Sequence, residues 1–132
     1  MIKEKNAQFA IEFIVLIAFM FIIFVGFTAI STSRVLEAKE NERQQIAQDI
    51  AALAKNEIDL AVKVSDGYSR TFKLPVAVDG NTYSIVMIDN RELVVNYLDK
   101  VYVVFLQDNV RGNINAGANT IRKENGIVYV NA

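Results

Sequence analysis

The pattern of hydrophobic and polar positions divides the chain into three parts, of which the first is the most apolar. Phe13–Ile30 is a run of 18 residues without a charge, interrupted only by Gly26 and Thr28. As a helix it rises about 1.5 Å per residue and spans roughly 27 Å, close to the hydrocarbon thickness of a bilayer. Because it is apolar on every side, it has no face for water. We predict that residues 8–33 form a helix that crosses a membrane or lies inside a bundle of helices.

A second helical pattern follows without a break. Residues 34–64 contain no Pro or Gly and are rich in good helix formers. Apolar positions recur at steps of three and four residues over the second part of this stretch: Ile46, Ile50, Leu53, Ala54, Ile58, Ala61 and Val62. We expect one helix of about 57 residues from Gln8 to Val64, with residues 34–66 as its amphipathic continuation. Gly67 is the predicted left-handed residue at its end.

The third part, residues 67–132, has the alternation and turn signals of β-strands. Tyr83, Ile85 and Met87, for example, alternate with their neighbours. Turns are predicted at 79–81 and 89–90, and Asn125-Gly126 is the strongest hairpin signal, joining 120–123 to 127–130. The predicted fold class is α+β: a long N-terminal helix, apolar in its first half and amphipathic in its second, followed by a small antiparallel β-sheet domain packed on the helix.

Two segments of the β part carry more specific expectations. Val101–Leu106 is continuously apolar, which predicts a central strand buried on both faces. Arg111–Asn119 is rich in Gly and Asn and is predicted to be a surface loop or irregular edge. The acidic residues of this part are interpreted as turn formers, namely Asp66, Asp79, Asp89, Asp99 and Asp108.

The composition argues against nucleic-acid binding, metal binding and catalysis. The chain has 14 basic and 15 acidic residues and a net charge of −1, so it has no basic footprint for nucleic acid. It contains no Cys and no His, which excludes disulfides, Cys- or His-based metal sites and the usual pairs of nucleophile and base. No phosphate-cradling glycine loop is present. We therefore predict no catalytic residue, no metal site and no cofactor.

The residues before the apolar run predict its orientation. Met1–Ala7 is short and polar and contains Lys3 and Lys5. Positive charge before an apolar segment holds that end in the cytoplasm, so the C-terminal part would face the outside of the cell. Conventional signal cleavage near Ser31 or Ser33 is an alternative. The absence of an Ala-x-Ala pattern and the charged helix that follows argue against it.

Glu12 does not fit the apolar run, because an unpaired carboxylate in hydrocarbon is costly or becomes protonated. In one interpretation Glu12 lies among the headgroups and is stabilised by the free N–H groups of the first helical turn. In the other it pairs with a cation. Lys3 and Lys5 are about two turns away, which is poor geometry. A cut before Gln8 would create an α-amino group four residues from Glu12, on the same or a neighbouring chain.

The aromatic residues of the apolar run also admit two interpretations. They are bulk that faces lipid, or they pack between like helices, where aromatic rings add dispersion contacts. The candidates for packing between like helices are four of these aromatic residues and one leucine: Phe13, Phe19, Phe24, Phe27 and Leu16.

The residues Gln8-x-Ala10-x-Glu12-x-x-x-Leu16 resemble the class III signal-peptide pattern of archaeal type IV-like pilins, Gln-x-Ser-x-Glu-x-x-x-Leu. Ala10 replaces the usual Ser, and Ala7 replaces the Gly often found before the Gln. The resemblance implies that a prepilin peptidase cuts between Ala7 and Gln8 and that residues 1–7 are a leader. Independently of the resemblance, a charged Glu12 that pairs with an amine at Gln8 would fix the axial register between subunits, and we take this as a hypothesis.

The same resemblance implies where the chain would be found and what it would assemble into. The chain would be inserted in the plasma membrane as a precursor and then assembled at the cell surface into a helical filament of its own copies. An assembly platform and an ATPase would be further partners. Adhesion, DNA uptake and cell contact stay open as roles for the filament. Two alternatives also stay open: a minor pseudopilin of a secretion system, and a single-pass membrane protein that keeps its N-terminus and displays the β domain as a binding module.

Overall fold

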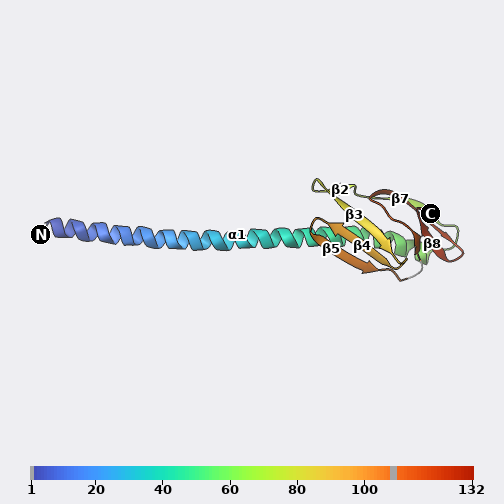
Figure 1. Cartoon of the computed structure of the whole chain (residues 1–132), viewed down its shortest axis with the longest axis horizontal. Helices are drawn as coiled ribbons and strands as arrows, with labels where there is room; N and C mark the ends of the chain where they lie inside the picture. The colour runs from blue at the N-terminus through green and yellow to red at the C-terminus, as the bar shows by residue number, and fades with distance from the viewer. Residues whose placement is uncertain (1, 108–109) are drawn as a thin grey trace. The chain divides into compact units, whose positions relative to one another are not determined.

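The computed structural model describes residues 2–107 and 110–132, and its elements confirm the predicted α+β class (Figure 1). A single long helix comes first and strands make up the rest. The elements are α1 (Ile2–Lys63), β1 (Ser69–Leu74), β2 (Ala77–Val78), β3 (Asn81–Ile88), β4 (Glu92–Tyr97), β5 (Lys100–Phe105), β6 (Val110–Gly112), β7 (Gly117–Glu124) and β8 (Ile127–Val130). The chain divides into two units, Met1–Glu40 and Asn41–Ala132, which are described separately below.

Helix α1 is continuous, as predicted, but it begins and ends elsewhere. It starts at Ile2 instead of Gln8, since the intervening Lys, Glu and Ala residues are good helix formers. It ends at Lys63, and the basic side chain in its last turn complements the helix dipole. Gly67 therefore lies beyond the helix. Its φ of 94° serves the turn into β1, where its N–H donates to the carbonyl of Lys123 at 2.9 Å.

The first unit is helical and unburied. From Ile2 to Glu40 every side chain is exposed except that of Ser31, which is half-buried. The unit contains an 18-residue stretch that is apolar enough to cross a membrane, and none of that stretch is buried in the chain. By length and composition, α1 is capable of spanning a bilayer.

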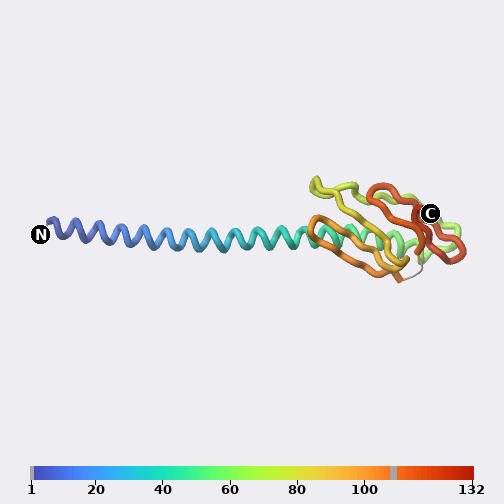
Figure 2. Tube along the Cα trace, viewed as in Figure 1, coloured from blue at the N-terminus to red at the C-terminus, as the bar shows by residue number. Residues whose placement is uncertain are grey.

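The second unit contains two four-stranded sheets in place of the single small antiparallel sheet that the sequence predicted. One sheet, in the order β2-β3-β4-β5, is a meander of consecutive hairpins. The other has the order β1-β7-β8-β6 and includes a parallel pair, β6 with β8. Its first pairing joins Ser69 to Arg122, and Figure 2 shows these distant segments side by side. Pairing between strands this far apart leaves no local signal in the sequence.

The helical part of the second unit packs against the strands through small side chains. Its fully buried residues are Ala47, Ile50, Ala51, Ala54, Ile58 and Ala61, which share a core with residues of β1, β3, β4, β7 and β8. Leu53, predicted in the stripe, is half exposed, because at about 100° per residue it lies roughly 110° from the centre of the buried face. The alanines let strands approach the helix closely, which a larger residue would prevent.

The prediction of a central strand at Val101–Leu106 is wrong. Strand β5 is the last strand of its sheet, and alternate residues along it are exposed. Continuous apolar sequence does not distinguish a strand buried on both faces from an edge strand with an uncovered apolar face.

The predicted turns at Asp79-Gly80 and Asp89-Asn90 are confirmed, with positive φ at all four residues, and Asn125-Gly126 joins β7 to β8. The predicted loop 111–119 is partly wrong. It contains parts of β6 and β7, and Ile114 and Asn119 are buried. Asp108 lies outside the described residues. An added Cβ at Gly112 would lie 1.9 Å from the carbonyl oxygen of Val130, so this position requires glycine.

Candidate functional site

The predicted assembly residues Gln8 and Glu12 lie one helical turn apart on α1 and contact each other. The Gln8 side-chain amide donates to the Glu12 carboxylate at 3.4 Å, and both side chains are exposed. Lys5 and Phe9 line a shallow hollow on the helix together with these two residues. The structure thus brings Gln8 and Glu12 together before any cleavage.

Glu12 has no cationic partner among residues 2–107 and 110–132. Neither Lys3 nor Lys5 forms an ion pair with it. In the second unit, by contrast, Asp59 lies 2.7 Å from the ammonium of Lys55 and Glu57 lies 3.5 Å from the guanidinium of Arg70. The amide of Gln8 satisfies one oxygen of Glu12 without neutralising its charge, so the carboxylate remains available to a cation from outside the described chain.

The predicted processing site, the peptide bond between Ala7 and Gln8, lies within α1. Residues before it are as helical as those after it. Removal of residues 1–7 would place Gln8 at a new helix N-terminus and Glu12 within the first turns, where the helix dipole favours a carboxylate.

The predicted packing residues fall on two faces of the helix. At about 100° per residue, Leu16, Phe19 and Phe27 lie within roughly 60° of Glu12. Phe13 and Phe24 lie roughly 100–120° around the helix from it. All five are largely exposed. A neighbour that contacts Glu12 would therefore meet the first three side chains and not the other two.

Hydroxyl groups near the end of the apolar segment are satisfied within the helix. Thr28 donates to the carbonyl of Phe24 at 2.8 Å, Thr32 to that of Thr28 at 2.9 Å, and Ser33 to that of Ala29 at 3.1 Å. Since these donors need no water, the hydroxyls do not prevent this part of α1 from entering an apolar medium.

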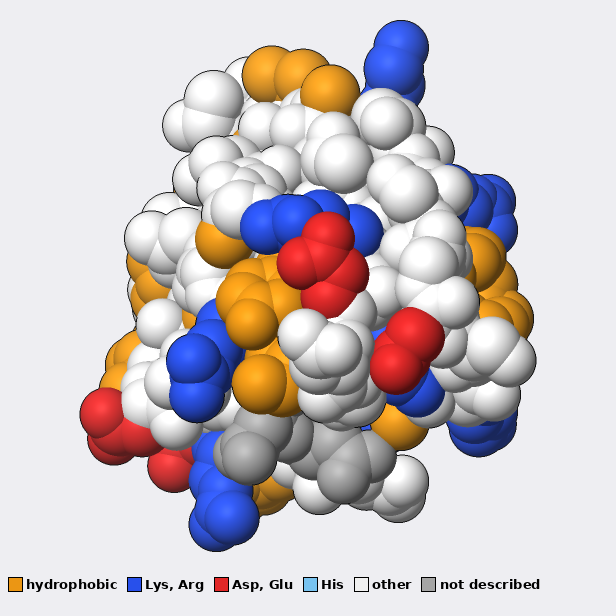
Figure 3. Space-filling model, turned by 90° about the vertical axis from the view of Figure 1, so that its right-hand side faces the viewer, with side chains coloured by type: hydrophobic (Ala, Val, Ile, Leu, Met, Phe, Trp, Pro, Cys, Tyr) orange, Lys and Arg blue, Asp and Glu red, His pale blue; other side chains and the backbone are white. Residues whose placement is uncertain are grey.

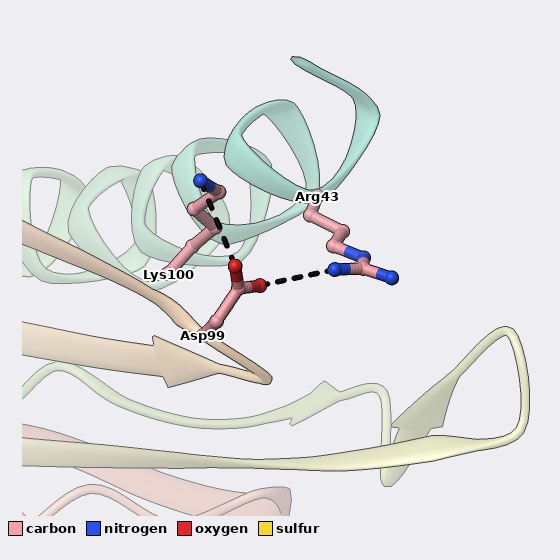
Figure 4. A network of polar contacts seen from close by, with 3 residues as sticks. All are labelled: Arg43, Asp99 and Lys100. Carbon is pink, nitrogen blue, oxygen red and sulfur yellow. Dashed lines mark hydrogen bonds and ion pairs between the residues drawn. The ribbon is translucent and has the colours of Figure 1, made fainter. Parts of the chain in front are cut away.

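A polar network that the sequence did not indicate joins α1 to the turn between β4 and β5 (Figure 4). Asp99 lies 3.3 Å from the guanidinium of Arg43 and 3.8 Å from the ammonium of Lys100. A hydrogen bond from its own backbone N–H holds the pKa of Asp99 below its ordinary value, and the charges of Lys100 and Arg43 add to this against a loss of hydration. Sequence analysis interpreted Asp99 only as a turn former, because its partner is 56 residues away.

Figure 3 shows one face of the second unit, on which no single kind of charge dominates. On the face shown in Figure 3, basic and acidic side chains are interspersed with apolar ones. No group of three or more acidic residues close enough to hold a metal ion occurs within the described ranges.

Comparison with known proteins adds no assignment: no protein-family model, curated protein or solved structure matches the chain.

Proposed function

We propose that the chain is the structural subunit of an extracellular filament of the archaeal type IV-like pilin kind. The observation that carries the proposal is an unburied apolar helix with one unpaired carboxylate, set in the pattern from Gln8 to Leu16. The chain would be inserted as a precursor, cut before Gln8 by a prepilin peptidase, and assembled at the cell surface with other copies. The proposal requires no catalytic residue and no cofactor.

The apolar half of α1 supports assembly because it is stable in two surroundings. Burying apolar side chains contributes about 1.5–3 kcal/mol for each large residue, whether the new neighbours are lipid tails or other helices. Passage from membrane to filament core exchanges one set of apolar neighbours for another. Apolar burial alone therefore does not fix which surroundings the helix prefers.

Glu12 supplies the preference. In lipid an unpaired carboxylate is costly. After cleavage the α-amino group of Gln8 on a neighbouring subunit is a cation of the right kind, and pairing is strong where water is excluded. A single charged pair in an apolar bundle also fixes the register between helices. Glu12 would thus favour the assembled state and one axial alignment within it.

The first experiment is the intact mass and N-terminal sequence of the protein recovered from cells that carry a prepilin peptidase. We expect a chain that begins at Gln8. The same spectrum shows whether Gln8 has cyclised, which would remove the amine. A chain that begins at Met1 would overturn the proposal in favour of the membrane-anchored binding module. A start near Ser33 would leave a secreted protein without its apolar helix.

The second experiment tests Glu12 against a matched control. Glu12→Val should leave membrane insertion intact and reduce filament yield by at least about tenfold, since the lost pair is worth more than about 1.4 kcal/mol in an apolar core. Glu4→Val removes a carboxylate from the same helix but within the predicted leader, so filament yield should not change. Membrane fractionation and electron microscopy provide the two measurements. Normal filaments from Glu12→Val would contradict the role of this residue. The abundance of the chain in purified filaments distinguishes two cases. A main subunit is abundant there, and a minor pseudopilin is sparse.

A further inference from the structure

The two edges of the sheet β2-β3-β4-β5 differ in how they are protected. Strand β2 has only two residues and follows Pro75 closely, and short strands and prolines are devices that prevent pairing at an edge. Strand β5 has six residues, no proline and no bulge in its pairing with β4. Among residues 2–107 and 110–132, no strand pairs with its other side.

The register shows which backbone groups of β5 are free to pair. The N–H of Leu106 donates to the carbonyl of Arg91 at 2.7 Å, at the end of the β4–β5 ladder. Because hydrogen-bonded positions alternate along an antiparallel strand, positions 104 and 102 bond to β4 in the same way. The N–H and C=O groups of Val101, Val103 and Phe105 therefore point away from β4, toward the open edge.

The side chains of these same three residues are exposed and apolar. They continue an apolar surface across the outer face of the sheet, where Val103 lies beside Val94 and Val94 beside Val86. The opposite face of β5 is engaged, since Tyr102 and Val104 pack against the core. Apart from Lys100 at its first position, β5 carries none of the charges that usually protect an edge.

We propose that this edge pairs with β5 of a second copy, antiparallel and centred on Val103. In this register Val101 lies opposite Phe105 of the other copy, and Val103 lies opposite itself. Each of the three pairs exchanges two backbone hydrogen bonds. The pairing is self-complementary: every exposed apolar side chain meets another, and no like charges are opposed. A second copy fits this edge because it presents the same free backbone groups and the same apolar side chains.

The symmetry of this contact decides how the two paired second units are oriented. The twofold axis of an antiparallel β5 pair is normal to the sheet, and it reverses every direction that lies in the sheet plane. The part of α1 in the second unit packs on the inner face of the sheets, so its axis runs along that plane. The helical segments of the two paired second units, residues 41–63, therefore run in opposite directions.

The contact is small. A patch of this kind covers roughly 300–600 Å². A standard stable interface buries about 800 Å² on each partner. We expect a contact that is weak between single chains and becomes effective where many copies lie close together. It does not depend on cleavage before Gln8 and would also hold for a membrane-anchored module.

The absence of cysteine makes a disulfide test direct. In the full chain in detergent micelles, Val103→Cys should cross-link under mild oxidation, since Cα atoms of a hydrogen-bonded pair lie about 5.5 Å apart, within disulfide range. Val86→Cys is the control. Its exposure is 39%, against 42% for Val103, but it lies two strands from the edge. We expect at least about tenfold faster cross-linking for Val103→Cys. Equal rates, or no dimer from Val103→Cys, would overturn the pairing.

The register has its own test. Val101→Cys and Phe105→Cys chains are mixed in detergent micelles and oxidised mildly. We expect heterodimers in the mixture, and little dimer from either variant alone. Homodimers of either variant that form as fast as the heterodimer would overturn the register. The urea midpoint of each variant, measured by tyrosine fluorescence, is compared with that of the wild type. Equal midpoints show that the variant is folded.

Discussion

The two halves of α1 are equally helical, yet they differ in what surrounds them. From Ile2 to Glu40 no side chain is buried, although this is the most apolar part of the chain. From Ala47 to Ala61 one face is fully covered by strands of the same chain. The second half therefore finds its apolar neighbours within the chain. The first half must find them in lipid or in other molecules.

This difference shows that helical sequence and a packed environment are separate requirements. Good helix formers explain why both halves adopt the same backbone. An isolated helix is nevertheless marginal in water, and most helical stability in proteins comes from the packing of an apolar face. The first half is a helix around which no other part of the described chain packs. We therefore expect its function to depend on the molecules that it contacts.

The largest expected difference between the halves lies in the free energy of unfolding. Ile50→Ala removes a buried side chain from the covered face and should destabilise the second unit by about 2–4 kcal/mol. Ile22→Ala makes the same change at a residue that is 68% exposed, and should alter stability by less than about 0.5 kcal/mol. Urea unfolding of the full chain in detergent measures both, with tyrosine fluorescence as the signal.

This signal reports on one half only, because all five tyrosines lie beyond residue 67. A loss from Ile22→Ala similar to that from Ile50→Ala would contradict the comparison, since the first half would then depend on the β strands.

A second difference concerns polar groups. The side-chain hydrogen bonds of the first half of α1 span four residues, whereas side chains of the second unit also bond to residues much farther along the chain. Asn119 is buried, and its amide oxygen accepts from the N–H of Asn115 at 2.9 Å and from the amide of Asn131 at 2.8 Å. Its own amide nitrogen donates to the carbonyl of Asn115 at 2.7 Å. Asn119→Ala leaves these partners unsatisfied and should cost about 2–3 kcal/mol.

The control is Asn96→Ala, which removes one hydrogen bond of 3.2 Å to Ser84 on the outer face of the sheet. Its effect should stay below about 0.5 kcal/mol. Urea midpoints that fall equally for both variants would mean that the buried network has no special role.

The same contrast explains what the sequence predicted and what it did not. The apolar run, the amphipathic stripe and the turns are local signals, and each predicted its element. The position of β5 within its sheet is not a local property, although its one partner, β4, is adjacent in the sequence. Six consecutive apolar residues were interpreted as a strand buried on both faces, whereas the order of the strands leaves β5 at the edge.

The candidate site divides in the same way. Glu12 was singled out as a carboxylate that does not fit the apolar run, and Gln8 by the resemblance to a signal-peptide pattern. Their contact follows from helical geometry, since they are four residues apart on one helix. The parallel pairing of β6 with β8 and the approach of Arg43 to Asp99 depend on the packed fold. Whether Glu12 meets a cation depends on a second molecule, so its role stays a prediction.

The smallest expected effect concerns the charges that join α1 to the β4–β5 turn, which the first half of the helix lacks. Because the pKa of Asp99 is lowered in the folded chain, its charge contributes stability above the unfolded pKa, near 3.9. That contribution is lost as the pH falls through the folded value. Asp99→Asn should therefore lower the urea midpoint slightly at pH 7 and less in 1 M salt, and the difference should shrink as the pH falls below about 3.9. Asp79→Asn, in a turn without an ion pair among the described residues, is the control, and its effect should not depend on salt. An Asp99→Asn difference that does not shrink as the pH falls would mean that the turn geometry of Asp99, and not its charge, stabilises this junction.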